Sequence, residues 1–406
     1  MKLPLLPAKT SIKGKRVFIR VDWNVPLNGS FAAEDSLKVS RSVETVRMLA
    51  KRGAVVLVAT HLGRPKGHDA SLSTHKILHR VSSQHGVKMD FLGEALDTEK
   101  GLKAAAANVK TAKPGSIILL ENVRFYTGEE KNTPALAKAY ASLADMYMNE
   151  AFASCHRAHA SVVGIAKLLP RYAGPALVQE VTALEKVLVK PKHPFVAVIG
   201  GAKLTTKFPV LAALLTVADR VCIGGAMAHA FFVAQKKEIG KSFLEKEGVA
   251  YAKKLLKDKK ILLPIDVVVA AKVASGVRPH TARVGAVKKS EMIGDIGPET
   301  MRAWAQEIRS AKTIVWNGPV GVAEIPAFSH GSLVLAHAIA ARSKGSAYGV
   351  VGGGDTLPVA LATGMSQWID PLSTGGGAML EFIAHKGTLP GLTALSAARS
   401  KTKKRA

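Results

Sequence analysis

The sequence contains few cysteines, few aromatic residues and no long hydrophobic run. Its two cysteines, Cys155 and Cys222, lie far apart in the 406-residue chain, which excludes a disulfide framework and a cysteine-based metal motif, so we expect reduced thiols. No apolar stretch is long and uninterrupted enough to span a bilayer, and the first residues lack the apolar core and cleavage site of a signal peptide. The sequence therefore predicts a soluble, cytoplasmic protein.

Acidic residues are also scarce relative to basic ones. Lysine and arginine total 57 against 30 aspartates and glutamates, which gives a formal net charge of +27. This charge favours a polyanionic partner, either nucleic acid or a small phosphorylated substrate, although a solvated basic surface explains most of these charges equally well. Aromatic residues make up 5% of the chain and no nucleic-acid-binding motif occurs, so we expect loose polyanion binding at most and no specific nucleic acid.

One pattern recurs along the chain: a short apolar strand, a turn with polar residues or glycines, and then a helical pattern. Strands that alternate with helices predict parallel sheets, and a chain of this length favours two domains. We therefore predict an α/β fold with two doubly wound, Rossmann-like parallel-sheet domains. The expected strands lie at 16–22, 54–60, 116–122 and 144–151 in the first half and at 195–201, 220–225, 313–318 and 348–354 in the second.

The strand ends of the first half carry arginine, histidine and short polar side chains. Ligands of open parallel sheets bind beyond the carboxyl ends of the strands, so these side chains should share one surface. Guanidinium and imidazole groups bind small polyanions through charge-assisted hydrogen bonds, although His61 and Arg64 would also suit an ordinary surface turn closed by Pro65. The recurrence of basic residues favours an anion pocket, whose candidate residues are Arg20, Asp22, Asn24, His61, Arg64, Arg124, His156 and Arg157.

The strand ends of the second half carry glycines instead. Glycine turns and helix N-termini present backbone N–H groups, which suit a polyphosphate. Lys203 and Lys207 lie on one face of an expected helix and could neutralise phosphate oxygens, while solvated lysines at a helix start are the alternative. The sequence has no P-loop, and VGGGDT is not a dinucleotide motif. The candidate glycines are Gly352, Gly353 and Gly354, with a further glycine turn at 375–377.

Two acidic residues of this half have two interpretations each. Asp355 is either the N-cap of the following helix or the ligand of a Mg²⁺ ion that arrives with a nucleotide. Glu324 is either an exposed loop acid or an acceptor for a ribose hydroxyl. No Ser/His/Asp order, zinc-ligand cluster or strong nucleophile occurs, which fits a reaction based on positioning and charge neutralisation, such as phosphoryl transfer. The residues favour a kinase with a small anionic substrate on the first domain and Mg-nucleotide on the second.

A series of motifs follows this plan from about Lys13 to Leu395. The motifs are RVDWNVPL, HLGRP, LLENVRF, NEAFASCHRAHAS, VIGGAKLTTK, PIDVVV, GDIGPET, WNGPVGVAE, GGGDT, STGGGAMLEF and LPGLTAL. In order and spacing the series resembles the phosphoglycerate kinase family. The resemblance implies reversible transfer of the acyl phosphate of 1,3-bisphosphoglycerate to Mg-ADP, which gives 3-phosphoglycerate and ATP. It also implies a monomer and an in-line transfer in a closed interdomain cleft.

The resemblance implies residue roles by matching positions. The anion-pocket candidates together with Lys38 would bind the phosphoglycerate, and Lys38, Arg157, Lys203 and Lys207 would be catalytic. Glu324 would bind the ribose, and Asp355 would bind the magnesium. The implied nucleotide-binding residues are Gly201, Ala202, Lys203, Lys207, Gly297, Asn317, Glu324, Gly352, Gly353, Gly354, Asp355 and Thr356.

The resemblance also implies a division of the chain. Residues 1–178 are expected to form the phosphoglycerate-binding domain and residues 179–387 the nucleotide-binding domain, with an interdomain helix and hinge at about 179–189. Residues 388–406 are expected to return to the first domain and to end in a basic tail. Closure of the two domains would exclude water from the reactive acyl phosphate.

Several positions depart from the family pattern, among them AKLTTK, which lacks the usual acid before Lys207, and one cysteine is a candidate for redox chemistry. Lys38 stands where the family has an arginine that stabilises the transferring phosphoryl group, so we expect slower chemistry with binding less affected. Ala153 replaces a glycine, which would exclude a glycine-only backbone angle. Ala323 replaces a common aromatic residue, which predicts a looser nucleoside pocket. Cys155 precedes two basic residues, so its thiolate would be stabilised, while a buried structural cysteine is the alternative.

Two other functions compete with the kinase. A nucleotide-dependent oxidoreductase on the same type of sheet would need a dinucleotide fingerprint and an acidic partner about twenty residues further on, and neither occurs in the sequence. A catalytically weakened kinase fold that binds anions or nucleic acid is supported by the net charge. Steeply salt-dependent DNA binding without turnover would distinguish this second alternative from a kinase.

Overall fold

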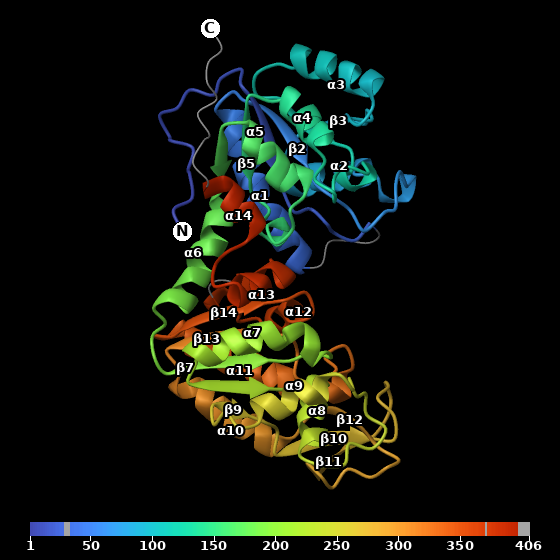
Figure 1. The fold of residues 1–406 in the computed structure, drawn as a ribbon, viewed down its shortest axis with the longest axis vertical. Coiled ribbons are helices and arrows are strands. Elements are labelled where there is room, and N and C mark those ends of the chain that lie inside the picture. The colour runs from blue at the N-terminus through green and yellow to red at the C-terminus, as the bar shows by residue number, and fades with distance from the viewer. Residues whose placement is uncertain (28–32, 370–371, 397–406) are drawn as a thin grey trace. The chain divides into compact units, whose positions relative to one another are not determined.

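The computed structural model describes residues 1–27, 33–369 and 372–396, which divide into two compact units (Figure 1). The first unit is Met1–Val181 with the segment that begins at Thr388, and the second is Thr182–Gly387. The basic tail at 398–406 lies outside the described residues. Among the helices of the described part, none is long and apolar enough to cross a membrane.

The first unit is built on a six-stranded sheet in the order β3-β4-β2-β1-β5-β6, and every strand pair in it is parallel. The central strands are apolar and buried along almost their whole length, because helices cover both faces of a parallel sheet. The strands are β1 Arg16–Arg20, β2 Val55–Ala59, β3 Asp90–Leu92, β4 Ile117–Leu120, β5 Met146–Asn149 and β6 Arg171–Ala173.

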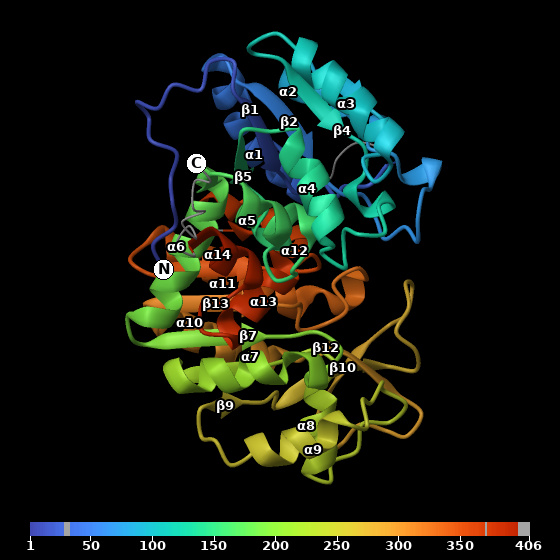
Figure 2. The same cartoon turned by 45° about the horizontal axis from the view of Figure 1, so that its top comes forward.

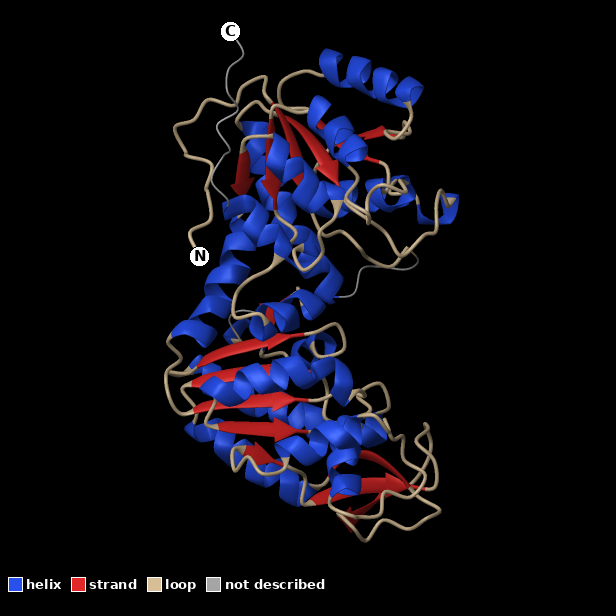
Figure 3. Ribbon diagram, in the orientation of Figure 1, coloured by secondary structure: helices blue, strands red, loops and turns tan. Residues whose placement is uncertain are grey.

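Helices flank this sheet on both sides, as the ribbon coloured by secondary structure shows (Figure 3). Phe18 of β1 packs against the rings of Tyr140 and Tyr147, with centroid distances of 5.2 and 6.3 Å, and these aromatic rings form part of the core. The helices are α1 Ala33–Lys51, α2 His75–His85, α3 Glu99–Thr111, α4 Pro134–Ser142, α5 Ile165–Leu168, α6 Pro175–Val189 and α14 Pro390–Ser396.

The last helix, α14, belongs to the first unit although it follows the whole second unit in the sequence. It lies beside α5 in Figure 1, and the Gly391 backbone N–H donates to the Cys155 carbonyl over 2.9 Å. A Cβ atom at Gly391 would lie 2.8 Å from Val162 Cγ1, so only glycine allows this close approach. The Arg171 guanidinium also donates to the Leu395 carbonyl over 3.1 Å. These contacts fix the helix on the first unit.

The second unit contains another six-stranded sheet, with the order β15-β14-β13-β7-β8-β9 and parallel pairing throughout. Helices α7 and α13 pack against each other, and so do α10 and α11; the turned view in Figure 2 shows α7 and α13 side by side. The strands are β7 Phe195–Ile199, β8 Arg220–Ile223, β9 Ile261–Leu262, β13 Thr313–Asn317, β14 Tyr348–Gly352 and β15 Leu372–Ser373. The helices are α7 Leu204–Val217, α8 Met227–Ala234, α9 Gly248–Leu255, α10 Pro298–Ser310, α11 His330–Lys344, α12 Leu357–Ala362 and α13 Gly376–Ala384.

A small antiparallel sheet, which the sequence analysis did not predict, adds to the second unit. Its three strands have the order β11-β10-β12, and their bounds are β10 Asp266–Ala270, β11 His280–Arg283 and β12 Met292–Ile296. Strand β11 is mostly exposed and polar, so it lacks the apolar run by which the other strands were found. Each of the strands that the sequence predicted overlaps an observed strand, and the predicted α/β class with two parallel sheets is confirmed.

Candidate functional site

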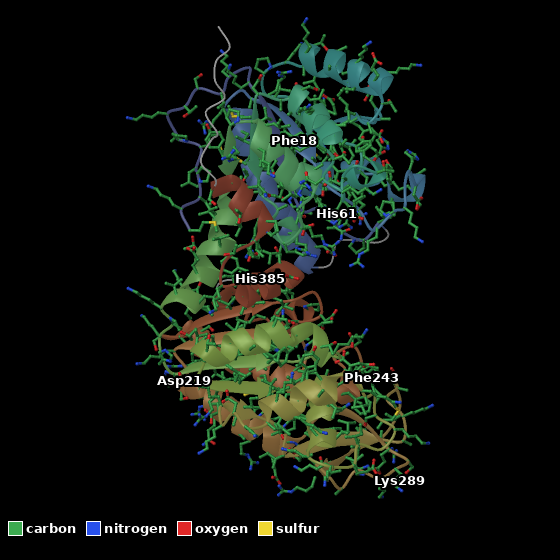
Figure 4. All side chains as sticks on the ribbon, viewed as in Figure 1. Phe18, His61, Asp219, Phe243, Lys289 and His385 are labelled. Carbon is green, nitrogen blue, oxygen red and sulfur yellow. The ribbon has the colours of Figure 1, made fainter. Side chains whose placement is uncertain are left out.

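The first candidate half-site lies where β1, β2, β4 and β5 end, because parallel strands bring their carboxyl ends to one edge of a sheet. Figure 4 labels Phe18 within β1 and His61, which follows β2. The pKa of His61 is well below its ordinary value, first because the ring is buried and then because of the Arg20 and Arg124 charges. His61 is therefore a neutral imidazole among guanidinium groups. In such a cluster the imidazole can form hydrogen bonds with an anion, while the guanidinium groups carry the positive charge.

Arg20 forms the floor of this half-site. Its side chain is only 1% exposed, and Nη2 lies 3.0 Å from His61 Nδ1 while Nε donates to Ser161 Oγ over 3.0 Å. An arginine that is buried so deeply keeps its charge, so it contributes a fixed positive field beneath the exposed groups. Arg20 is thus held in place beneath His61 by hydrogen bonds to buried groups.

The other predicted anion-binding residues differ in how firmly they are held. Arg124 donates from Nη1 to the Gly63 carbonyl over 2.6 Å, and Asn24 Oδ1 accepts the Gly63 N–H over 2.9 Å. Arg64 and Arg157 are exposed, and Arg157 Nε lies 3.1 Å from His156 Nε2. The loop after β2 is therefore fixed by two predicted residues, and the two exposed guanidinium groups are available to a ligand.

Lys38 and Asp22 are placed near these loops but outside the contacts of the basic cluster. Lys38 lies on α1, and its ammonium is 3.6 Å from Asp35 on the same helix. Trp23 anchors α1 to the loop after β1, because its indole N–H donates to Ser42 Oγ over 2.7 Å. Asp22 is half-buried, whereas its neighbours in the sequence, Val21 and Trp23, are buried. The hydrogen bond from Trp23 to Ser42 therefore helps to hold in place the helix that carries Lys38.

A buried acid that the sequence analysis missed supports the basic cluster. Glu129 is 0% exposed and accepts hydrogen bonds from Ser161 Oγ (2.5 Å), from Ser161 N (3.1 Å) and from the Tyr140 hydroxyl (3.3 Å). Ser161 also accepts from Arg20, so the chain of hydrogen bonds runs from Glu129 through Ser161 to Arg20. Burial raises the pKa of Glu129 and the Arg20 charge opposes this rise. No sequence signal separated Glu129 from its exposed neighbour Glu130.

The redox hypothesis for Cys155 is wrong. The thiol is 0% exposed, and burial raises its pKa to about 12, so the reactive thiolate does not form near neutral pH. The concern about Ala153 also disappears, because the segment Phe152–Ser154 is a 3₁₀ helix and Ala153 does not have a positive φ. Ala153 and Cys155 are thus structural residues of the short 3₁₀ helix, and of its C-terminal cap, that precede Arg157 in the chain.

The second candidate half-site is a cavity of about 470 Å³ in the second unit. Its wall includes the turns that follow β7, β8, β13 and β14. Most of the predicted nucleotide-binding residues line it: Gly201, Ala202, Lys203, Lys207, Asn317, Glu324, Gly353, Gly354, Asp355 and Thr356. Two predicted residues, Gly297 and Gly352, do not line the cavity, because Gly297 caps α10 against Asp266 and the Gly352 carbonyl faces Asn317.

Lys207 connects the ends of two neighbouring strands beneath this cavity. Its ammonium donates to the Gly200 carbonyl over 2.6 Å and to Asn317 Oδ1 over 2.7 Å, and it lies 3.3 Å from the Asn317 carbonyl. Burial lowers its pKa to about 8, and the Asp355 charge partly opposes this shift. The sequence analysis put Lys203 and Lys207 on one helix face, but Lys203 is an exposed N-cap residue of α7 and only Lys207 turns inward.

Glycine is required in the strand-end turns around Lys207. Gly318 follows β13 with a φ of +88°, and a Cβ atom there would lie 2.3 Å from the Gly200 carbonyl oxygen and 2.7 Å from Lys207 Nζ. Its backbone N–H donates to Thr356 Oγ1 over 2.7 Å, which joins the turn after β13 to the turn after β14. The absence of side chains therefore lets the turns pack around the ammonium and leaves backbone groups along the cavity.

Asp355 and Glu324 are exposed residues of the cavity wall. Thr356, not Asp355, is the N-cap residue of α12, so the capping interpretation of Asp355 is wrong. No group of three or more His, Cys, Asp or Glu side chains that could hold a metal occurs within residues 1–27, 33–369 and 372–396. An exposed carboxylate beside glycine turns suits a cation that is bound partly by the phosphates of a ligand.

The far wall of the cavity is largely apolar and was missed by the sequence analysis. Its residues come from α8, from the small antiparallel sheet and the segment just before it, and from the loop after β13; they include His229, Phe232, Pro264, Val267, Ile293, Val320 and Val322. Glycine turns on one side and an apolar wall on the other match a ligand with a polyphosphate at one end and a flat ring at the other. The small sheet could not be found from the sequence, so neither could this wall.

Comparisons with known proteins agree with this arrangement. The family described as phosphoglycerate kinase matches residues 8–386. The phosphoglycerate kinase of Thermus thermophilus is 42% identical over 388 residues, which cover 94% of this chain and 97% of the relative, and that of Moorella thermoacetica is 42% identical over 95% and 97%. The solved phosphoglycerate kinase of Coxiella burnetii superposes with a TM-score of 0.82 at 37% identity and covers 97% of this chain and 99% of its own. That of Pyrococcus horikoshii has a TM-score of 0.82 at 29% identity, with 96% and 98% covered.

Replacement of Glu129 tests the buried support of the basic cluster. We expect Glu129→Ala to lower the free energy of unfolding by about 3 kcal/mol, because it leaves the Ser161 and Tyr140 donors buried without an acceptor. The matched control is Glu130→Ala, which removes an exposed carboxylate next to it and should change stability by less than about 0.5 kcal/mol. Urea unfolding followed by circular dichroism measures both. Equal effects of the two variants would contradict the assigned role.

The lowered pKa of Lys207 predicts a stability change with pH. The unfolded lysine has an ordinary pKa of 10.5 and the folded one about 8, so between these values the unfolded chain binds the extra proton. The free energy of unfolding contributed by this group should therefore rise by about 3 kcal/mol from pH 8 to pH 10.5, and it should be constant below about pH 8, where Lys207 is protonated in both the folded and the unfolded chain. Urea unfolding of the wild type and of Lys207→Met across this range isolates the effect. A difference between them that does not vary with pH would show that Lys207 titrates normally.

Proposed function

The chain belongs to the phosphoglycerate kinase family, and we propose which of its residues carry out that family's reaction. As a phosphoglycerate kinase, the protein transfers a phosphoryl group reversibly between the acyl phosphate of 1,3-bisphosphoglycerate and ADP, with a carboxyl group as the acceptor in the reverse direction. The residue assignment is supported by one observation: the first unit has a cluster of guanidinium and imidazole groups, and the second unit has a cavity lined by glycine turns and Lys207.

The basic cluster of the first unit would bind the phosphoglycerate. The exposed guanidinium groups of Arg64 and Arg157 supply the bidentate donors that suit a phosphate or a carboxylate. Neutral His61 contributes hydrogen bonds without further charge, and the Arg20 charge beneath it attracts the anion. Arg124 and Asn24 hold the loop at Gly63 in place, and Asp22 and His156 complete the predicted set.

The cavity of the second unit would bind the nucleotide. The turns at Gly201 and Gly353 would present backbone groups to the phosphates, Lys203 would add an exposed charge, and Glu324 would accept a ribose hydroxyl; all four residues line the cavity, which supports this proposal. When a nucleotide binds, the Lys207 ammonium would exchange one of its hydrogen bonds to a backbone carbonyl for one to a phosphate oxygen, whose charge it would neutralise. Because a nearby phosphate raises the pKa of an ammonium, nucleotide binding would restore the full charge of this lysine.

Mg²⁺ fits the residues on this wall. The ion prefers oxygen ligands and is usually bound by one or two carboxylates together with substrate phosphates and waters, and Asp355 supplies one exposed carboxylate at the phosphate end. When bound, Mg²⁺ would neutralise charge on the β- and γ-phosphates. We propose Asp355 as its protein ligand.

The reaction itself needs little covalent help from the protein. In-line transfer requires the acyl phosphate and the terminal phosphate of the nucleotide to meet, so we propose that the chain bends within α6, which runs from the first unit into the second. Lys38, Arg157, Lys203 and Lys207 would then stabilise charge on the transferring group. Exclusion of water at this moment protects the acyl phosphate from hydrolysis.

Location and partners follow from the same proposal. We place the enzyme in the cytoplasm as a monomer, with its two substrate pairs as its only specific partners. The alternative of a catalytically weakened anion or nucleic-acid binder is not favoured, because the family assignment covers nearly the whole chain and the basic residues at the strand ends have a substrate to bind. Loose polyanion binding through the remaining charge is compatible with catalysis.

The test of the proposed sites is ADP formation from ATP and 3-phosphoglycerate during a magnesium titration. Asp355→Asn removes the proposed ligand charge while keeping the shape of the side chain, and we expect kcat/KM to fall at least ~100-fold with a higher magnesium requirement. Glu307→Gln, which changes a half-buried acid outside the cavity lining, serves as the control and should behave as wild type. A wild-type magnesium dependence in Asp355→Asn would remove the residue from the proposed site.

Lys38 should limit the rate of the chemical step. We expect Lys38→Arg to raise kcat by about tenfold, which corresponds to ~1.4 kcal/mol of transition-state stabilisation, with little change in KM, because the planar guanidinium contacts two phosphoryl oxygens at once. Arg41→Lys is the control: Arg41 lies 3.6 Å from Glu180, so its replacement should leave kcat unchanged. Steady-state kinetics in both directions measure this. An unchanged kcat in Lys38→Arg together with a reduced kcat in Arg41→Lys would assign the role to Arg41 instead.

A further inference from the structure

His229 and Asp295 are the titratable side chains on the part of the cavity wall formed by α8 and the small antiparallel sheet, and the two oxygens of Asp295 accept the Ile296 and Gly331 backbone N–H groups. His229 comes from α8, is only 3% exposed, and packs near Phe232 with a ring-centroid distance of 6.2 Å. A histidine at such a position is costly to bury unless its nitrogens have partners. The question is therefore what each ring nitrogen of His229 binds.

One nitrogen has a fixed partner. His229 Nδ1 lies 2.7 Å from the backbone carbonyl oxygen of Phe243, a residue labelled in the loop region of the second unit in Figure 4. A carbonyl oxygen can only accept, so Nδ1 carries the proton. The pKa of His229 is lowered by burial, which keeps the ring neutral near neutral pH. Nε2 is then a hydrogen-bond acceptor.

The acceptor nitrogen is left for the cavity. The two ring nitrogens point to nearly opposite sides of an imidazole, so a ring whose Nδ1 edge faces Phe243 turns its Nε2 edge elsewhere. His229 lines the cavity, and within the described part of the chain Nε2 has no hydrogen bond and is not among the fully buried unpaired atoms. His229 Nε2 is thus an acceptor of fixed tautomer on the apolar wall, available to the flat ring of a ligand.

We propose that His229 selects the nucleobase, with Nε2 accepting a hydrogen bond from the exocyclic amino group of adenine. This inference rests on the proposed nucleotide site in the same cavity. Hypoxanthine and guanine have a carbonyl oxygen in place of that amino group, so two acceptors would face each other without a proton between them. Because Nδ1 is held by the Phe243 carbonyl, the ring cannot switch to the other tautomer without losing that bond. The enzyme therefore prefers adenine nucleotides.

The experiment compares ATP with ITP, which differs from ATP at the base where the amino group becomes a carbonyl. Formation of 1,3-bisphosphoglycerate from 3-phosphoglycerate is measured with each nucleotide. We expect kcat/KM for wild type to be about tenfold higher with ATP, and we expect His229→Phe, which keeps a flat ring but removes the acceptor, to reduce this ratio to near one through a loss with ATP. KM for 3-phosphoglycerate should not change.

The outcomes separate this inference from the site assignment on which it rests. A wild-type ratio near one overturns the proposal without any variant, and so does an unchanged ratio in His229→Phe. Lys207→Ala provides the second arm of the experiment. If this variant no longer binds ADP or IDP, but the ratio of kcat/KM for ATP to that for ITP is unchanged in His229→Phe, the nucleotide site is supported and only the role of His229 is wrong. If Lys207→Ala leaves both affinities unchanged, the cavity is not the nucleotide site and the inference falls with it.

Discussion

The shared edge at which parallel strands end is the constraint on which the two half-sites depend. In each unit the strand order places four consecutive turns side by side, although the turns are separated by tens of residues in the sequence. The chain uses the two edges differently. In the first unit the turns carry guanidinium and imidazole groups, and in the second they carry glycines that expose backbone groups. The same backbone geometry therefore suits a small carboxylate and phosphate in one unit and a polyphosphate in the other, which is the division that we propose.

Buried polar groups hold the reactive side chains in both units before any ligand binds. Glu129 and Ser161 fix Arg20 from below, and the carbonyls of Gly200 and Asn317 with the Asn317 amide fix Lys207. Burial costs solvation energy for each of these charges, and the hydrogen bonds offset part of that cost. A ligand phosphate would supply a countercharge. We infer that both sites hold their charged groups in place before a ligand binds, which would favour binding of anions and stabilisation of a transferring phosphoryl group.

The sequence predicted the parts of the fold and site that depend on local patterns. Buried parallel strands are continuous apolar runs, and the polar or glycine residues after them mark the strand ends, so Arg20, His61, Lys207 and Gly353 could be found without a structure. Residues that act through long-range contacts could not. Glu129 reaches Ser161 across 32 positions, and His229 enters the cavity wall through α8, opposite a small sheet whose strand β11 is exposed and polar. The burial of Cys155 and the inward turn of Lys207 likewise depend on packing by distant elements.

We propose that each unit binds one substrate with its own set of residues. Isothermal titration of the full-length chain with 3-phosphoglycerate and with ADP, in wild type, Arg64→Ala and Lys207→Ala, tests this division most directly. The account predicts that Arg64→Ala loses affinity for 3-phosphoglycerate and keeps that for ADP, while Lys207→Ala does the reverse. Loss of both ligands in either well-folded variant, or loss of the opposite ligand, would contradict the division of binding between the two units.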